Sequence, residues 1–211
     1  MRRILIPVVA LAVLIFMGTG SVRGMGGPVP QLLDGDILFQ RTRSGQAKAI
    51  SLATHSPYTH TGILFYRKGK PFVFEAVQPV KLTPLDKWAD RGKAGHFVVM
   101  RVRNRETLLT PKVLKKMKAE GERHLGKEYD MTFEWSDEKM YCSELVWKIY
   151  KRGAGLEIGC LSALGSFDLS HPMVRDLMKK RYGKSLPLKE PVLSPADMME
   201  SDLLERVYSR N

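Results

Sequence analysis

The chain has 211 residues, of which 44% are hydrophobic and 27% are charged. This composition is that of a globular protein with one substantial core, and it excludes an intrinsically disordered chain, a collagen-like chain and a polytopic membrane protein. Lys and Arg number 34 against 22 Asp and Glu, which gives a formal net charge of +12. An excess of this size predicts an anionic partner, for which nucleic acid, lipid headgroups and acidic polymers all qualify.

The first 24 residues have the pattern of a secretory signal peptide. Met1 to Arg3 form a short basic start, residues 4–17 form an uncharged apolar run, and the small residues 18–24 offer a cleavage site after Gly24. The run is shorter than the roughly 20 residues that a permanent membrane helix requires, although an uncleaved anchor is the open alternative. We therefore expect an exported protein of the periplasm or cell envelope, with one domain over residues 25–211 and no permanent membrane span.

Export also changes the charge that a partner meets. Three Arg and no acidic residue lie within residues 1–24, so the net charge falls from +12 to +9 once they are removed. Outside the cytoplasm, nucleic acid is no longer an expected partner. An anionic cell-wall polymer or a lipid headgroup surface takes its place in the prediction.

Strand patterns fill the first half of the remaining chain and helix patterns fill most of the second, which predicts an α+β fold. The expected strands are residues 37–40, 61–66, 72–77 and 97–103, with the middle two joined as a hairpin through 67–70. The expected helices are 44–53, 110–124, 139–152 with an end at Gly153, and two later helices that begin at Ser-His-Pro 170–172 and Ser-Pro 194–195.

Cys142 lies in the first turn of the expected helix 139–152. Together with Leu145, Val146 and Ile149 it follows the i, i+3, i+4, i+7 spacing of a core-facing stripe. The free N–H groups and the positive dipole end of a helix start stabilise a thiolate, which lowers the pKa of a cysteine below its usual value of about 8.5. A buried structural cysteine gives the same pattern, so a nucleophile requires a base within reach.

His60 and Glu75 are expected to meet across the hairpin. A four-residue loop at 67–70 places Glu75 opposite Gly62, on the same sheet face as His60 and diagonal to it. Diagonal neighbours lie roughly 7–8 Å apart at Cα, and Gly62 puts no side chain between them. Because the strand around Glu75 is apolar on both faces, its carboxylate requires a specific partner. The alternative is a pairing of Glu75 with a surface Lys or Arg.

These residues predict a catalytic triad in which His60 is the base, Glu75 orients it and Cys142 is the nucleophile. A metal site made of His55, His60 and Glu75 is the competing constellation. It ranks lower because no recognised ligand spacing surrounds these residues. Neither a metal nor another cofactor is therefore expected.

Five motifs in chain order carry a resemblance to a known family. They are DGDILFQ at 34–40, ATHSPYTHTG at 53–62, VFEA at 73–76, GKEYD at 126–130, and WSD at 135–137 with YCSEL at 141–145. From about residue 31 to near the C-terminus, the sequence resembles the YaeF/YiiX type of permuted papain-like amidases, a branch of the NlpC-related superfamily. The resemblance implies a circularly permuted papain-like fold, with an antiparallel sheet packed against helices and with His60, Glu75 and Cys142 at the catalytic positions.

Related families cleave cell-wall peptides or transfer and hydrolyse acyl groups on lipids. We therefore expect an exported cysteine amidase or peptidase that forms an acyl-enzyme and cleaves an amide or ester bond in a cell-envelope substrate such as a peptidoglycan peptide. An acyltransferase or lipid esterase with the same triad is a second possibility. A third is a non-catalytic envelope-binding module in which Cys142 and Cys160 form a disulfide. Tyr58, Trp135 and Tyr141 flank the motifs and are candidates for substrate binding, although aromatic residues at such positions more often serve packing.

Overall fold

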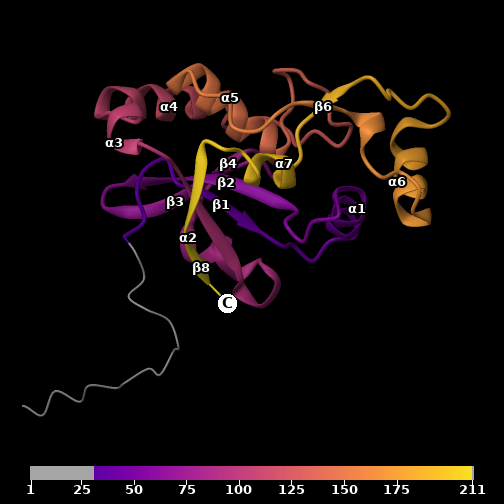
Figure 1. Ribbon diagram of the computed structural model, residues 1–211, viewed down its shortest axis with the longest axis horizontal. Coiled ribbons are helices and arrows are strands. Elements are labelled where there is room, and N and C mark those ends of the chain that lie inside the picture. Colours follow the sequence, from indigo (N-terminus) through magenta and orange to yellow (C-terminus); the bar gives the residue numbers. More distant parts are fainter. Residues whose placement is uncertain (1–30, 211) are drawn as a thin grey trace, which may run out of the picture.

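The structure, a computed structural model, describes residues 31–210, so the expected leader over residues 1–24 lies outside the described part. A six-stranded antiparallel sheet runs in the order β4-β3-β2-β1-β5-β8 (Figure 1). Its strands are β1 Ile37–Gln40, β2 His60–Arg67, β3 Lys70–Glu75, β4 Lys81–Pro84, β5 Phe97–Val102 and β8 Leu204–Arg210. Two short strands, β6 Ser162–Ala163 and β7 Pro191–Val192, form a separate pair. The expected α+β class is confirmed.

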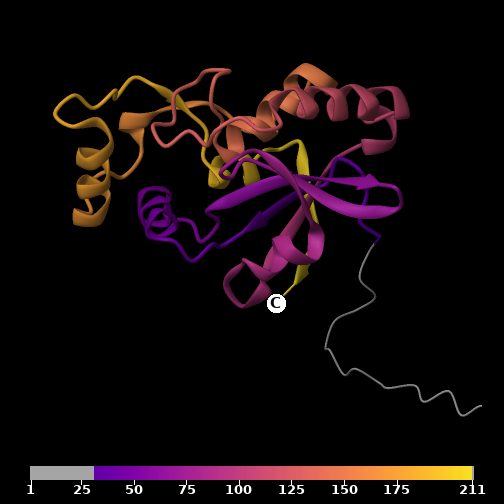
Figure 2. The ribbon, with the colours of Figure 1, turned by 180° about the vertical axis from the view of Figure 1, so that it is seen from behind.

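The helices cover both faces of the sheet and one of its ends. They are α1 Gly45–Thr54, α2 Leu85–Asp90, α3 Arg105–Leu108, α4 Pro111–His124, α5 Cys142–Ala154, α6 Pro172–Tyr182 and α7 Pro195–Met199. Helices α4 and α5 lie together over one face (Figure 1). Seen from behind, α1 and α6 lie side by side at the end of the molecule away from α3 (Figure 2). None of the helices within residues 31–210 is long and apolar enough to span a bilayer.

The central strands are apolar on both faces because each face packs against a helix layer. Ile37, Phe39 and Ile63 point towards α4 and α5 and form the main core with the stripe of α5 that the sequence predicted. Leu38 and Leu64 point the other way and form a second core beneath α2. Charged and catalytic residues in these strands are therefore held in place by packing on two sides.

The β2–β3 hairpin has the predicted register and a tighter turn than predicted. Tyr66 pairs with Pro71, as the sequence indicated, and Arg67 pairs with Lys70. The turn is therefore only Lys68 and Gly69, whose φ angles are 50° and 74°. Two consecutive positive φ angles are typical of the hairpin turn that matches the twist of antiparallel strands. The four-residue loop was wrong, but the register is unchanged, so Glu75 still lies on the face of His60.

Helix α5 begins at Cys142 and continues past Gly153 to Ala154. Gly153 is not the helix end because its role is packing: a Cβ there would lie 2.6 Å from the Cα of Met117 in α4. Gly155, with φ 75°, is the residue that ends the helix. Because Gly153 carries no side chain, α4 and α5 can approach closely, which fixes the position of the helix that carries Cys142.

The sequence predicted none of the shorter elements β4, α2, α3, β6 and β7, nor the edge strand β8. Helix α2 has only six residues, and β8 is an edge strand whose side chains are largely exposed. Both lack the long periodic pattern that identifies an element in a sequence. The segment of β4 and α2 is important for the site, because it brings Thr83, Trp88 and Arg91 beside the end of β3.

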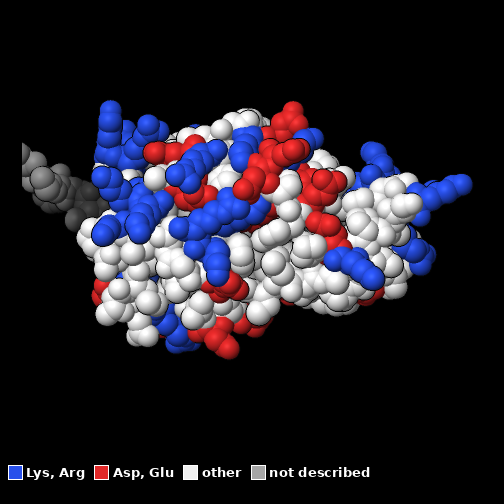
Figure 3. Space-filling model, turned by 90° about the horizontal axis from the view of Figure 1, so that it is seen from above, with Lys and Arg blue, Asp and Glu red and all other residues white. Residues whose placement is uncertain are grey.

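Seen from above, positive side chains project at the two ends of the molecule, over α3 and α4 and around α6, and acidic and further positive side chains are mixed between them (Figure 3). On α4 the exposed lysines are Lys112, Lys115 and Lys116. On α6 and the segment after it they are Lys179, Lys180, Lys184 and Lys189.

Candidate active site

Three elements bring the predicted catalytic residues together. His60 opens β2, Glu75 ends β3 and Cys142 opens α5. His60 Nε2 lies 2.7 Å from Glu75 Oε2, so the predicted contact across the hairpin is present. The side chains are buried, with 7% of His60, 3% of Cys142 and none of Glu75 exposed. Such burial strengthens the interactions among these groups because little water screens them.

The Cys142 thiol interacts with His60 from the helix start. Burial on its own raises the pKa of Cys142, but a hydrogen bond and charge interaction with His60, together with backbone hydrogen bonds from Thr61 and Ser143, lower it below the usual value. Since Nε2 of His60 faces Glu75, Nδ1 is the ring nitrogen left for the thiol. The thiol of Cys142 therefore ionises more readily than a free cysteine does.

His60 is held in its charged form. Burial lowers the pKa of the imidazole, but hydrogen bonds and charge interactions with Cys142 and Glu75 outweigh burial and raise this pKa to about 9. At neutral pH His60 is thus protonated, and the lowered pKa of Cys142 favours the thiolate and imidazolium pair that acyl transfer by cysteine requires.

Glu75 has three partners that stabilise its charge. Besides His60, Thr83 donates its hydroxyl to Oε1 at 2.5 Å, and Arg91 donates from Nη2 to both carboxylate oxygens. Burial raises the pKa of this carboxyl, but the hydrogen bond and charge of His60, followed by the bonds from Arg91 and Thr83, lower it to about 2. The alternative prediction, that Glu75 pairs with a surface Lys or Arg, is correct in part. Glu75 pairs both with His60 and with the partly exposed Arg91.

Trp88 of α2 covers the His60 ring. The two rings stack with their centroids 6.2 Å apart and an angle of 29° between their planes, and the indole is fully buried. This apolar cover keeps the imidazole in one orientation. Neither Trp88 nor Arg91 nor Thr83 was predicted, because only the pairing of β3 with β4 shows that their segment faces Glu75.

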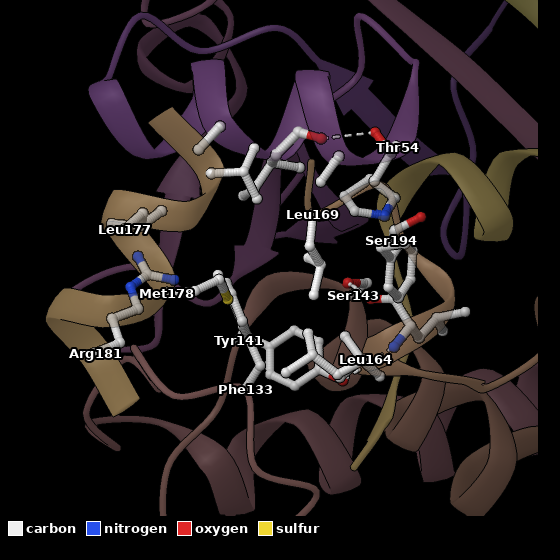
Figure 4. Close-up of a pocket in the computed structure, with 18 of the residues that line it drawn as sticks. Thr54, Phe133, Tyr141, Ser143, Leu164, Leu169, Leu177, Met178, Arg181 and Ser194 are labelled. Carbon is white, nitrogen blue, oxygen red and sulfur yellow. Dashed lines mark hydrogen bonds between the residues drawn. The ribbon is translucent and has the colours of Figure 1, made fainter. Parts of the chain in front are cut away.

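An apolar pocket adjoins Cys142 (Figure 4). It is a narrow hollow that is partly open to solvent. Its walls come from α1, from α6, and from the segments that precede and follow α5. The side chains that line it are mostly apolar and include Ala49, Ile50, Phe133, Leu164, Val174, Leu177 and Met178. No sequence pattern predicted this pocket, since the segments that form its walls are far apart in the chain.

The three aromatic candidates for substrate binding have different surroundings. Tyr141 lines the pocket beside Cys142 and accepts a hydrogen bond on its hydroxyl from the N–H of Leu193. Tyr58 stacks on His96 with centroids 6.2 Å apart, and Trp135 packs edge-to-face on Trp147 at 5.2 Å. Neither Tyr58 nor Trp135 belongs to the pocket lining.

The residues of the competing metal site do not come together. His55 is exposed at the end of α1 and pairs with Asp168 at 3.2 Å, whereas His60 and Glu75 are buried together. Within residues 31–210, no group of three or more His, Cys, Asp or Glu side chains is placed to hold a metal ion.

The disulfide of the non-catalytic alternative is not formed. Cys142 and Cys160 are both free thiols, the first buried and the second exposed. Cys142 is engaged by His60 at the helix start instead, so its surroundings are those of a reactive thiolate and not those of a crosslink.

Comparisons with known proteins show the family and the fold. Residues 31–208 match the model of the family described as permuted papain-like amidase enzyme, YaeF/YiiX, C92 family. The uncharacterized protein YiiX of Escherichia coli K12 is 49% identical over 173 residues, which are 82% of this chain and 84% of that protein. A crystal structure described as the metalloprotein YiiX of Escherichia coli O157:H7 superposes with a TM-score of 0.81 at 48% identity, covering 85% of this chain and 98% of that one. The chain belongs to the YaeF/YiiX family of permuted papain-like amidases and has its fold.

Proposed function

We propose that this protein is a cysteine hydrolase that cleaves an amide or ester bond through an acyl-enzyme on Cys142. The observation that carries the proposal is the 2.7 Å contact of His60 with Glu75 beside a buried cysteine at a helix start. Membership of a papain-like amidase family supports the same chemistry. The pKa values of Cys142 and His60, one lowered and the other raised, are what a thiolate and imidazolium pair requires.

In the first half of the reaction, the Cys142 thiolate attacks the carbonyl carbon and the carbonyl oxygen becomes an oxyanion. Backbone N–H groups in the first turn of α5 stabilise this charge, aided by the helix dipole. His60 then gives its proton to the departing nitrogen or oxygen, which leaves a thioester on Cys142. In the second half, His60 takes a proton from water, the hydroxide attacks the thioester, and the acid product leaves as the thiolate is restored.

Glu75 acts on this reaction through His60. Its hydrogen bond to Nε2 fixes the tautomer and keeps Nδ1 directed at the thiol, and its charge favours the imidazolium. Arg91 and Thr83 hold the carboxylate in place, and Trp88 holds the ring. They are positioning residues, because each acts through Glu75 or His60.

The pocket favours an apolar acyl group on the thioester. Its walls offer many aliphatic and aromatic contacts and few hydrogen-bonding groups, so a polar peptidoglycan peptide gains little from entering it. An acyl chain gains burial of roughly 0.8 kcal/mol for each methylene. This observation favours the lipid esterase or acyltransferase alternative over a cell-wall peptidase, and the acceptor, water or an alcohol, decides between those two.

The related protein YiiX of Escherichia coli O157:H7 is described as a metalloprotein, so we asked whether the residues of this site could hold a metal ion. The donors of this chain do not fit one. Glu75 accepts hydrogen bonds on both oxygens from Arg91, His60 Nε2 is taken by Glu75, and no third ligand joins His60 and Cys142 among the described residues. The proposed mechanism therefore has no metal step.

The proposal extends to location. An exported protein with a positive surface is attracted to the anionic polymers or lipid headgroups of a cell envelope. The lysines of α4 and α6 are exposed and supply this attraction at both ends of the molecule (Figure 3). They hold the enzyme near an envelope substrate, while Cys142 and the pocket select the bond.

The test compares the wild type with Cys142→Ala and Cys160→Ala on two substrate panels, peptidoglycan fragments and acyl lipids or amides, with products identified by mass spectrometry. Product formation by the wild type and by Cys160→Ala, with none by Cys142→Ala, is the expected result. Turnover that persists in Cys142→Ala would contradict the proposal. Products from the peptidoglycan panel alone would contradict the preference for an apolar acyl group.

A further inference from the structure

Arg181, in the last turn of α6, brings a positive charge to the wall of the apolar pocket (Figure 4). Its Nε, Nη1 and Nη2 atoms are all buried, and none has a hydrogen-bond partner within residues 31–210. The Phe133 ring lies 5.0 Å from the guanidinium and contacts its face, which leaves the N–H donors at its edge unused. A guanidinium offers five such donors, so this cation has a large unmet capacity for hydrogen bonding.

Asp130, the carboxylate that interacts electrostatically with Arg181, does not accept a hydrogen bond from it within the described residues. Asp130 attracts Arg181 but makes no ion pair with it in the described part of the chain. Its Oδ1 accepts from the N–H and the hydroxyl of Thr132 at 2.7 Å each. Its Oδ2 is buried without a partner. Burial lowers the pKa of Arg181, and Tyr129, Tyr182 and Asp130 only oppose this effect from a distance. Leaving a charge buried and unpaired is costly, so its retention in a pocket indicates an anionic ligand.

Arg181 and the nucleophile lie at opposite sides of the pocket. In Figure 4, Arg181 enters from α6, whereas Ser143, the residue after Cys142, lies across the cavity. Apolar groups line the pocket on both sides, with Leu177 and Met178 near Arg181 and Leu164 near Ser143 (Figure 4). A ligand that spans the pocket therefore meets a nucleophile at one end, apolar side chains along its length and a guanidinium at the other end.

We infer that the pocket selects an acyl group whose far end carries a carboxylate, bound by Arg181. The assignment of the near end to the scissile carbonyl rests on the proposed function. A carboxylate matches the planar guanidinium with two parallel hydrogen bonds. It is favoured over a phosphate because it carries one negative charge, and the desolvation of a doubly charged group in an apolar pocket costs more. The substrate class is an amide or ester of a dicarboxylic acid or of another apolar acid with a distal carboxylate.

Binding tests this inference without turnover. The Cys142→Ala protein is titrated by calorimetry with suberic acid monoamide, which has an amide at one end and a carboxylate at the other, and with octanamide, which lacks the carboxylate. We expect the monoamide to bind at least about tenfold more tightly, as a charged hydrogen-bonded pair in a buried site gives. The preference falls to near one when Arg181→Met is added. Lys180→Gln, which removes an exposed charge from the same turn, leaves the preference unchanged and is the matched control.

Folding of the variant is checked in the same experiment. Arg181→Met removes an unpaired buried charge, so its unfolding midpoint without ligand is expected to equal or exceed that of the parent protein. Arg181→Lys retains the charge without the planar fork and is expected to keep part of the preference.

Two outcomes would overturn the inference: octanamide binding as tightly as the monoamide, or a preference for the monoamide that survives Arg181→Met. Hydrolysis of p-nitrophenyl octanoate and of the half-ester of suberic acid by the wild type is measured alongside. A binding preference without hydrolysis would contradict the proposed function but support the anion site at Arg181. Hydrolysis without a binding preference would support the proposed function but contradict the anion site.

Discussion

Arg91 donates from one Nη2 nitrogen to both carboxylate oxygens of Glu75, and so a residue at the end of α2 completes the charge balance of the site. With Cys142 as thiolate and His60 as imidazolium, the four groups carry two negative and two positive charges. A buried cluster with no net charge is easier to keep out of water than a triad with a net charge. Arg91 thereby allows a glutamate, and not a neutral amide, to orient the histidine.

Replacing Arg91 tests this role. Arg91→Met removes the hydrogen bonds but leaves the pocket intact, so kcat is expected to fall while KM stays nearly constant. We expect a loss of about tenfold, the lower end for a hydrogen bond to a charged group, because Arg91 is partly exposed. Steady-state kinetics check this result, with Arg91→Lys expected to recover part of kcat. A rise in KM at constant kcat would mean that Arg91 contacts the substrate instead.

The same variant changes stability in acid. The pKa of Glu75 in the folded protein is about 2, below its usual value near 4.5, so its ionisation stabilises the fold above pH 4.5 and this contribution is lost as the pH falls through 2. Without Arg91 the folded pKa rises towards the usual value, so the contribution is smaller and its loss is complete at a higher pH. Urea unfolding between pH 2 and 5 measures the effect. Parallel pH curves for the wild type and Arg91→Met would contradict the proposed pairing.

The pH dependence of catalysis follows from the same pair of groups. Activity requires a thiolate on Cys142 and a proton on His60, so kcat/KM rises with pH as the thiol ionises and falls as His60 loses its proton at about pH 9. Glu75→Gln removes the negative charge that favours the imidazolium, so the alkaline fall is expected to move to lower pH. A fall that stays at the same pH in Glu75→Gln would contradict the assignment of this limb to His60.

Thiol alkylation compares two cysteines in one molecule. Cys142 is buried but has a lowered pKa, whereas Cys160 is exposed. Near neutral pH, iodoacetamide is expected to modify Cys142 faster than Cys160, because reactivity follows the thiolate fraction. His60→Ala is expected to slow Cys142 by at least about tenfold and to leave Cys160 unchanged, since it removes the hydrogen bond and the charge that lower the pKa of the thiol. Peptide mass spectrometry follows both sites, and equal slowing of both would indicate a general change of structure.

A substitution at Gly153 tests the close packing of α5, which carries Cys142, against α4. A methyl group at this position meets the Met117 backbone at 2.6 Å, so Gly153→Ala is expected to lower the free energy of unfolding by roughly 2–3 kcal/mol through overpacking. Gly45→Ala, in open space at the start of α1, is the control and is expected to be neutral or slightly stabilising. Chemical denaturation measures both. Equal stability of the two variants would contradict the tight α4–α5 contact.

Much of the site could be predicted from the sequence because two of its features depend on residues that are close together in the chain. The register of the β2–β3 hairpin is set by its short turn and by the residues that flank it. This register places Glu75 beside His60. The helical spacing after Cys142 places that thiol in a first turn. The pairing of this helix start with the β2 end is a tertiary contact, which the family resemblance implied and no local pattern could give.

The remainder of the site depends on contacts that no local pattern encodes. Arg91 reaches Glu75 only because β4 pairs with β3 and α2 then folds back over the sheet. The pocket needs α1 and α6, which lie more than a hundred residues apart in the chain, to pack against each other. At Gly153 a local pattern gave a wrong prediction. Glycine is typical of helix ends, but here it lies inside α5 and allows α4 to pack closely.

The central claim is that Cys142 carries an acyl group during turnover, and intact-protein mass spectrometry after rapid mixing with p-nitrophenyl decanoate tests it most directly. The account predicts a transient mass increase of one decanoyl group, located on Cys142 by peptide mapping, present in Cys160→Ala and missing from Cys142→Ala. His60→Ala should accumulate the adduct slowly and fail to release it, because both the thiolate and the activation of water depend on His60. An adduct of equal yield in Cys142→Ala, or hydrolysis by the wild type without any protein adduct under rapid mixing, would contradict the account.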